Sequence, residues 1–127
     1  MPEKHLFEYA VIRLVPRVER GEYINVGVVL YCKPLRFLDF KYEVNKEKLA
    51  SISPETDFKE ACHHLESFKK ICQSSSDSGL IGLQDMPSRF RWLIAKRSTI
   101  IQASEVHPGY CLNAEEKINE IFVTMVL

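Results

Sequence analysis

The sequence lacks a hydrophobic run long enough to cross a membrane. Its longest apolar stretch, Val26 to Cys32, is interrupted by Gly27, whereas a transmembrane helix needs about 20 consecutive apolar residues. Near the N-terminus, Glu8 breaks the apolar core that a secretory signal requires. We therefore expect a cytoplasmic protein without a membrane partner.

An excess of charge of either sign is also missing, because 17 Lys and Arg balance 17 Asp and Glu. A formal net charge of zero argues against a strongly basic protein that coats nucleic acid, although it leaves room for a local basic patch. Hydrophobic residues make up 46% of the sequence and charged residues 27%, which is close to the average for soluble domains. The length of 127 residues fits one domain over residues 1–127.

Signatures of metal binding and of nucleophilic catalysis are absent too. The sequence contains no Cys-x-x-Cys pair, nucleophile elbow, phosphate-cradling glycine-rich loop or metalloprotease motif. His63 and His64 are adjacent on a predicted helix and point about 100° apart, so they do not converge on one metal ion. We therefore predict no metal site and no cofactor, and we expect the cysteines to be free buried thiols. The four cysteines are Cys32, Cys62, Cys72 and Cys111.

The strands are expected mainly in the first third of the chain. Residues 6–15 and 23–31 are rich in aliphatic and aromatic side chains and flank a charged turn at 16–22, which predicts an antiparallel hairpin. Residues 37–42 and 99–103 are two further candidate strands, and Pro108-Gly109 is a candidate turn. One face of the second strand is wholly aliphatic and is expected to meet the helices, whereas the face with Asn25 and Gly27 is expected to be more open. The aliphatic face consists of Ile24, Val26, Val28 and Leu30.

Helices are expected mostly after the strands. A long amphipathic helix is predicted to begin at Ser53-Pro54, and a short one to cover residues 88–95. Asn113 is expected to cap a last helix, with Glu116 completing a capping box. This order of elements favours an α+β fold, in which a mainly antiparallel sheet of three to five strands has helices packed on one face.

The densest polar cluster lies at the end of the predicted hairpin, where Arg13, Arg17 and Arg20 fall within eight residues. The planar fork of an arginine suits carboxylate or phosphate groups. A solvated turn with ion pairs between Arg17 or Arg20 and Glu19 or Glu22 is the alternative. Asn25 and Gly27 interrupt an otherwise aliphatic strand, which indicates a bulge or the close approach of another group. The alternative is that Gly27 makes room for a large neighbour such as Trp92.

Basic and aromatic residues alternate from Arg89 to Arg97, which is typical of single-stranded nucleic-acid binding. The helical spacing of Phe90, Leu93 and Ile94 favours a core role instead. The segment Arg97-Ser98-Thr99 is able to offer a guanidinium and hydroxyls to an anion, or to satisfy a helix end. Further along, His107 precedes the candidate turn and is either an acid, base or anion donor, or a structural residue.

Two long segments resemble the signature of an uncharacterised bacterial family, known as domain of unknown function 3037. The first runs over residues 9–30, and the second over residues 90–102, followed by His107-Pro108-Gly109. The likeness covers nearly the whole chain, although residues 45–85 match only in general pattern. Lys96 stands where many relatives have proline.

The resemblance implies no known reaction, but it does imply that many polar residues of the two segments belong to family motifs. Members of the family are often encoded beside a kinase-like protein that is similar to the toxin kinases of bacterial persistence modules. This association implies a small partner subunit of a toxin–antitoxin type module.

Three hypotheses for function follow. The first is a non-enzymatic accessory or binding subunit that presents an anion-favouring surface to a protein partner, for which the resemblance suggests a kinase-like protein. The second is an enzyme for a phosphorylated or nucleotide substrate, with His107 or Glu19 as acid or base. The third is a nucleic-acid-binding domain that uses Arg89, Arg91, Lys96 and Arg97, and a homodimer through an exposed edge strand is also open. The candidate anion- or partner-binding residues are Arg13, Arg17, Arg20, Asn25, Arg91, Arg97, Ser98 and Gln102.

Overall fold

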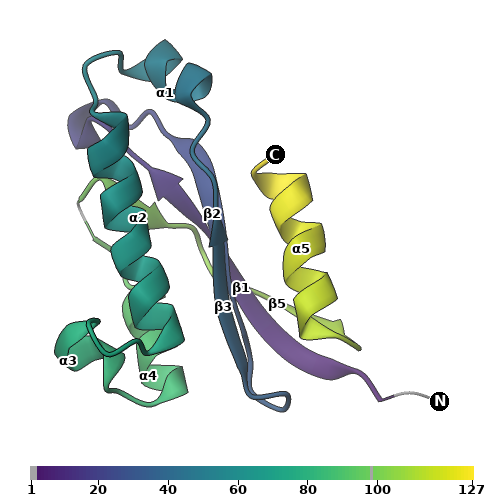
Figure 1. Ribbon diagram of the computed structural model, residues 1–127. Helices are drawn as coiled ribbons and strands as arrows, with labels where there is room; N and C mark the ends of the chain where they lie inside the picture. The colour runs from purple at the N-terminus through teal and green to yellow at the C-terminus, as the bar shows by residue number, and fades with distance from the viewer. Residues whose placement is uncertain (1–2, 98) are drawn as a thin grey trace.

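Strand β1 is the centre of the sheet, since it pairs with other strands along both of its sides. A computed structural model describes residues 3–97 and 99–127 and shows five antiparallel strands in one sheet (Figure 1). The order is β3-β2-β1-β4, and β5 also pairs with β1, so that β4 and β5 follow one another along the same edge. The strands are β1 (His5–Leu14), β2 (Ile24–Cys32), β3 (Phe37–Tyr42), β4 (Ile101–Ala103) and β5 (His107–Cys111).

The four longer helices begin at side chains that accept hydrogen bonds from free backbone N–H groups. Asn113 caps the last helix by accepting from the backbone N–H of Glu116, as expected from the sequence. The predicted helix start at Ser53 is wrong, because Ser53 ends a first short helix and Asp57 caps the long one. The helices are η1 (Val18–Arg20), α1 (Lys46–Ile52), α2 (Phe58–Gln73), α3 (Gly79–Gly82), α4 (Met86–Ile94) and α5 (Ala114–Met125).

A β-bulge in β2 divides the aliphatic face that the sequence pattern predicts. Ile12 pairs with Gly27 and Arg13 pairs with Asn25, so Val26 is an extra residue without a partner on β1. An extra residue shifts the alternation by one. As a result Val26 joins the core under α2 and α4, whereas Val28 joins the core under α5. The prediction of a single aliphatic face is therefore wrong.

Helices cover both faces of the sheet, rather than the one face expected. On one face, Leu65 of α2 and Phe90 and Leu93 of α4 pack with Ile12 and other residues of the sheet. On the opposite face, Ile118 of α5 packs with Leu30. Figure 1 shows the sheet between α2 and α5. The α+β class is confirmed, and the face expected to be open is closed, since Val29 and Tyr31 are buried.

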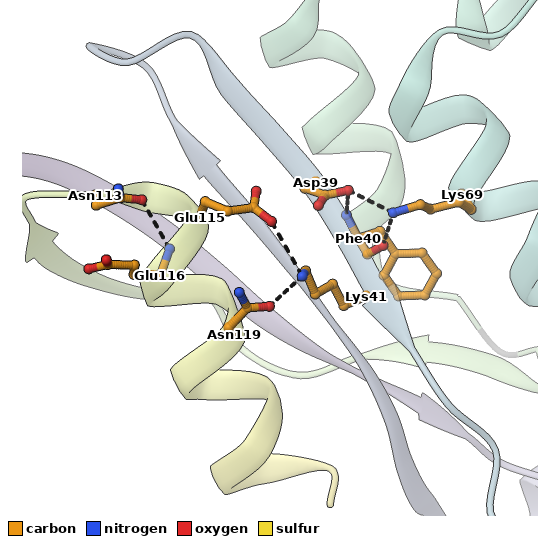
Figure 2. Close-up of polar contacts among 8 residues, drawn as sticks. All are labelled: Asp39, Phe40, Lys41, Lys69, Asn113, Glu115, Glu116 and Asn119. Carbon is orange, nitrogen blue, oxygen red and sulfur yellow. Dashed lines mark hydrogen bonds and ion pairs between the residues drawn. The ribbon is translucent and has the colours of Figure 1, made fainter.

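Polar contacts attach edge strand β3 to both helical layers (Figure 2). Lys69 of α2 donates to the Asp39 carboxylate, at 2.8 Å, and to the Phe40 carbonyl, at 2.6 Å. Lys41 forms an ion pair with Glu115 of α5, at 3.4 Å, and donates to Asn119. Charged side chains on an edge strand oppose pairing with a further strand.

The predicted turn at Pro108-Gly109 is wrong, because both residues lie inside β5. Gly109 is the cross-strand partner of Phe7, and a Cβ atom at position 109 would come within 2.6 Å of the Phe7 ring. The glycine is therefore a packing site for the ring rather than a turn residue. Its neighbour Pro108 lies on the outer strand of the sheet, where a proline is tolerated.

Within the described residues, no helix combines the length and the apolar composition that crossing a bilayer requires. The four cysteines are free thiols, and three of them are buried. Burial raises the pKa of the Cys72 thiol to about 12, so this thiol stays protonated, and unreactive, at neutral pH.

Replacing Gly27 with alanine should destabilise the fold. A Cβ atom there would lie 2.5 Å from the Phe40 ring and 2.8 Å from the Lys41 carbonyl oxygen, so the close neighbour is Phe40 rather than Trp92. We expect Gly27→Ala to lower the free energy of unfolding by about 1–3 kcal/mol, as overpacking does. Urea denaturation measures this, with Gly21→Asn as a control at an open position. Wild-type stability of Gly27→Ala would contradict this packing.

Candidate functional site

An open depression of about 660 Å³ lies at the edge of the sheet where β4 ends and β5 begins. Its walls come from β1, from the segment after α4, and from the segment that joins the two edge strands. The residues that line it are Arg13, Lys96, Arg97, Gln102, Ala103, Ser104, Glu105 and His107.

The depression exists because the edge strand is interrupted. Ile12 pairs with Ala103 and Tyr9 pairs with His107, so three steps along β1 correspond to four steps along the edge. The extra residue makes a bulge, which pushes the joining segment away from β1. Ser104 closes the break: its hydroxyl accepts from the backbone N–H of Val11 at 2.9 Å, and its own N–H donates to the Val11 carbonyl at 2.8 Å.

Three polar side chains stand in one row across β1 and its two neighbours. Arg13 is the cross-strand partner of Asn25 on β2 and of Gln102 on β4. Cross-strand partners point to the same face of a sheet, and here that face is the one that α5 covers. The guanidinium of Arg13 lies 4.4 Å over the ring of Tyr23, a cation–π contact that fixes its orientation.

Arg97 reaches the depression from the segment after α4. Its guanidinium lies 4.1 Å from the centre of the Trp92 ring and donates to the Trp92 carbonyl. Partial burial lowers the pKa of Arg97, but an arginine keeps its proton in proteins. The stack on Trp92 therefore presents a fixed positive charge at this wall.

The lining is basic overall. Arg13, Lys96 and Arg97 supply three positive charges and Glu105 one negative charge, which leaves a net charge of +2 with His107 neutral. Lys96 pairs with Glu105 and, through this hydrogen bond, lowers the pKa of the Glu105 carboxyl. Both members of the pair are exposed, so water screens their attraction. An anion that binds Lys96 in place of Glu105 therefore gives up little free energy.

Two buried polar atoms beside the depression lack a hydrogen-bond partner in residues 3–97 and 99–127. They are Nε of Arg13 and Oδ1 of Asn25. The amide nitrogen of Asn25 donates to the Met125 carbonyl at 3.0 Å, so Asn25 holds the C-terminal end of α5. An unpaired buried donor costs free energy, and an acceptor group that reaches Arg13 would recover it.

His107 completes the wall at β5. Its ring packs against Tyr9, with the ring centres 5.3 Å apart, and its side chain is exposed. The structure thus brings Arg13, Arg97, Gln102 and His107 together, although they come from both sequence motifs.

Other candidate residues lie elsewhere. Arg17, Glu19 and Arg20 are exposed on or beside η1, and none of them lines the depression. Arg20 forms an ion pair with Glu22 at 2.7 Å, one of the pairs that the charged-turn alternative anticipates. Ser98 lies outside the described residues.

Arg91 is exposed on α4 and lines a different groove. Arg89 is buried and donates to the Gln84 carbonyl at 2.7 Å, so it holds the start of α4. The four basic residues of the nucleic-acid hypothesis therefore do not form one continuous stripe. In the described part of the chain, no group of three His, Cys, Asp or Glu side chains is arranged to hold a metal ion.

Two features of the site were not expected from the sequence. Ser104 closes the strand break, and the Lys96–Glu105 pair forms one rim. Sequence spacing does not reveal either feature, because each depends on the bulge in the edge strand.

The family model of DUF3037, described as a protein of unknown function, matches residues 9–126. The chain belongs to this family. No curated protein and no solved structure matches the chain. Both segments that carried the resemblance to DUF3037 lie inside the matched range, and the depression is where they meet in space.

Replacing Ser104 with alanine should destabilise the protein by about 1–3 kcal/mol, because a buried N–H group at Val11 loses its acceptor. The local effect should exceed the global one, since the break is held by few other contacts. Hydrogen exchange at the Val11 amide, measured by NMR, should accelerate more than exchange at Val29. Equal acceleration at both amides would contradict the role of Ser104 as a local closure.

Proposed function

We propose that this protein is a non-enzymatic binding subunit whose basic depression takes an anionic group of a protein partner. The observation that carries the proposal is the meeting of Arg13, Arg97, Gln102 and His107 in one open depression with a net positive charge. Three of these side chains end in groups that donate hydrogen bonds to an anion without deprotonation, and His107 does so in either of its charge states.

The positions of the two arginines support a preorganised site. Arg13 is held over Tyr23 and Arg97 over Trp92, so little rotational freedom remains to be lost when an anion arrives. A carboxylate or a phosphate fits the fork of donors that an arginine presents. The depression, at about 660 Å³, falls within the range of sites that take a small molecule or part of a larger ligand.

An enzyme is the second candidate, but the arrangement of the residues supports it less well. That mechanism needs Glu19 and His107 in one pocket as acid and base. Glu19 lies exposed on η1 and is not one of the described residues that line the depression. His107 alone remains as a candidate acid or base, and it stands beside the arginines as a donor.

The first test measures direct anion binding, with the fluorescence of the single tryptophan, Trp92, as the signal. Because the Arg97 guanidinium stacks on its ring, an anion bound to Arg97 should change the emission. We expect a saturable change with phosphate or sulfate beyond that caused by chloride at equal ionic strength. Arg13→Met should weaken binding about tenfold, equivalent to about 1.4 kcal/mol.

Arg17→Met/Arg20→Met serves as the matched control, because it removes two arginines of the same hairpin that lie outside the depression. This control should bind like the wild type. Arg97→Met removes the group that stacks on Trp92, so its anion affinity is measured by isothermal titration calorimetry instead of fluorescence. It should lose as much affinity as Arg13→Met. Equal weakening by the control and by Arg13→Met would place the anion site elsewhere.

The second test addresses the partner. The family resemblance makes a kinase-like protein the first one to look for. A tagged wild-type protein should retain a specific partner from its native host, identified by mass spectrometry, and Arg13→Met/Arg97→Met should lose it while circular dichroism shows an intact fold. Retention of the same partner by this variant would exclude the depression as the docking site.

A further inference from the structure

A second surface lies at the other end of β1, on the face that α2 and α4 cover. Leu6 and Glu8 share this face, and their cross-strand partners on β5 are Tyr110 and Pro108. Leu6 is 47% exposed and Tyr110 is 65% exposed, although each belongs to a strand of the sheet. Large exposed apolar side chains that lie next to one another indicate a surface that binds another molecule.

Helices α2 and α4 do not cover this end of the sheet face. Among the strands, helix α4 packs on β2 and β4, and Figure 1 shows the N-terminal end of β1 and β5 leading away from α4. A groove of about 350 Å³ remains between α4 and the sheet. It is lined by Leu6, Glu8, Tyr31, Lys33, Pro34, Pro87 and Arg91.

The charges around the groove are of both signs. Glu8 stands on β1 between the apolar residues, whereas Lys33 follows the end of β2 and Arg91 projects from α4. This distribution differs from that of the basic depression, where a second copy would bring like charges together. A surface with an apolar centre and charges of both signs is able to complement itself across a two-fold axis.

We propose that this face joins two copies of the chain into a symmetric dimer. Leu6 and Tyr110 of each copy pack against those of the other, and Glu8 of each copy faces Arg91 of the other. The formal net charge of zero means that two copies do not repel one another at long range. The two surfaces share no described lining residue, so a dimer formed here leaves both anion sites free.

Sedimentation equilibrium of the full chain, over a wide range of concentrations, tests the proposal. The wild type should be a dimer that dissociates on dilution, and Tyr110→Glu should raise its dissociation constant at least tenfold. Leu80→Glu is the matched control, because Leu80 is an 80% exposed leucine on α3 that does not line the groove. This control should dimerise like the wild type.

Charge reversal tests the orientation of the two copies. Glu8→Arg and Arg91→Glu should each weaken the dimer, and the double variant should restore it, because the pair is then reformed with its signs exchanged. Neither residue needs to change the fold, since both are exposed, and urea denaturation checks this.

A wild type that stays monomeric at every concentration would overturn the proposal and leave the groove to a different protein. A dimer that is indifferent to Tyr110→Glu would place the interface elsewhere and also overturn it. Failure of the double variant to recover dimerisation would reject the Glu8–Arg91 pairing and, with it, this arrangement. Arg13→Met should still dimerise, so the outcome is independent of the anion site.

Discussion

The structure depends on the pairing of β1 along both of its sides. One side pairs with β2 over most of its length, and the other is divided between β4 and β5. Backbone N–H and C=O groups in a buried strand must find partners, and at the division Ser104 supplies the two bonds that Val11 would otherwise lack. The loop that leaves the edge at this point forms the wall of the basic depression.

Two irregularities of pairing, rather than the regular sheet, give the molecule its surfaces. The bulge at Val26 sends neighbouring aliphatic residues of β2 to opposite faces, so helices are needed on both. The bulge between Ala103 and His107 separates β4 from β5, and Arg13 and Gln102 line the depression beside it. An extra residue in one strand changes which side chains share a face, and both changes occur beside the same row of polar groups.

The two proposed surfaces use different physical interactions. In the depression, like charges gather around Arg13 and Arg97, and aromatic rings hold both guanidinium groups. Such a site favours an anion and rejects another copy of itself. At the other end of β1, exposed Leu6 and Tyr110 lie among charges of both signs. Apolar area gives association its free energy there, and the mixed charges fix its geometry.

The sequence by itself determined the α+β class, the third strand at residues 37–42, the cap at Asn113 and the bulge or close approach marked by Asn25 and Gly27. These depend on local periodicity and backbone chemistry, which neighbouring residues carry. Only the tertiary structure decided that Arg13 meets Arg97 and His107 while Arg17, Glu19 and Arg91 do not. Spacing along a chain does not record an extra residue in a strand pair, and one such residue reassigns every side chain beyond it. Pro108-Gly109 shows the same limit, since it belongs to a strand that pairs with β1, and the Phe7 ring packs against the glycine.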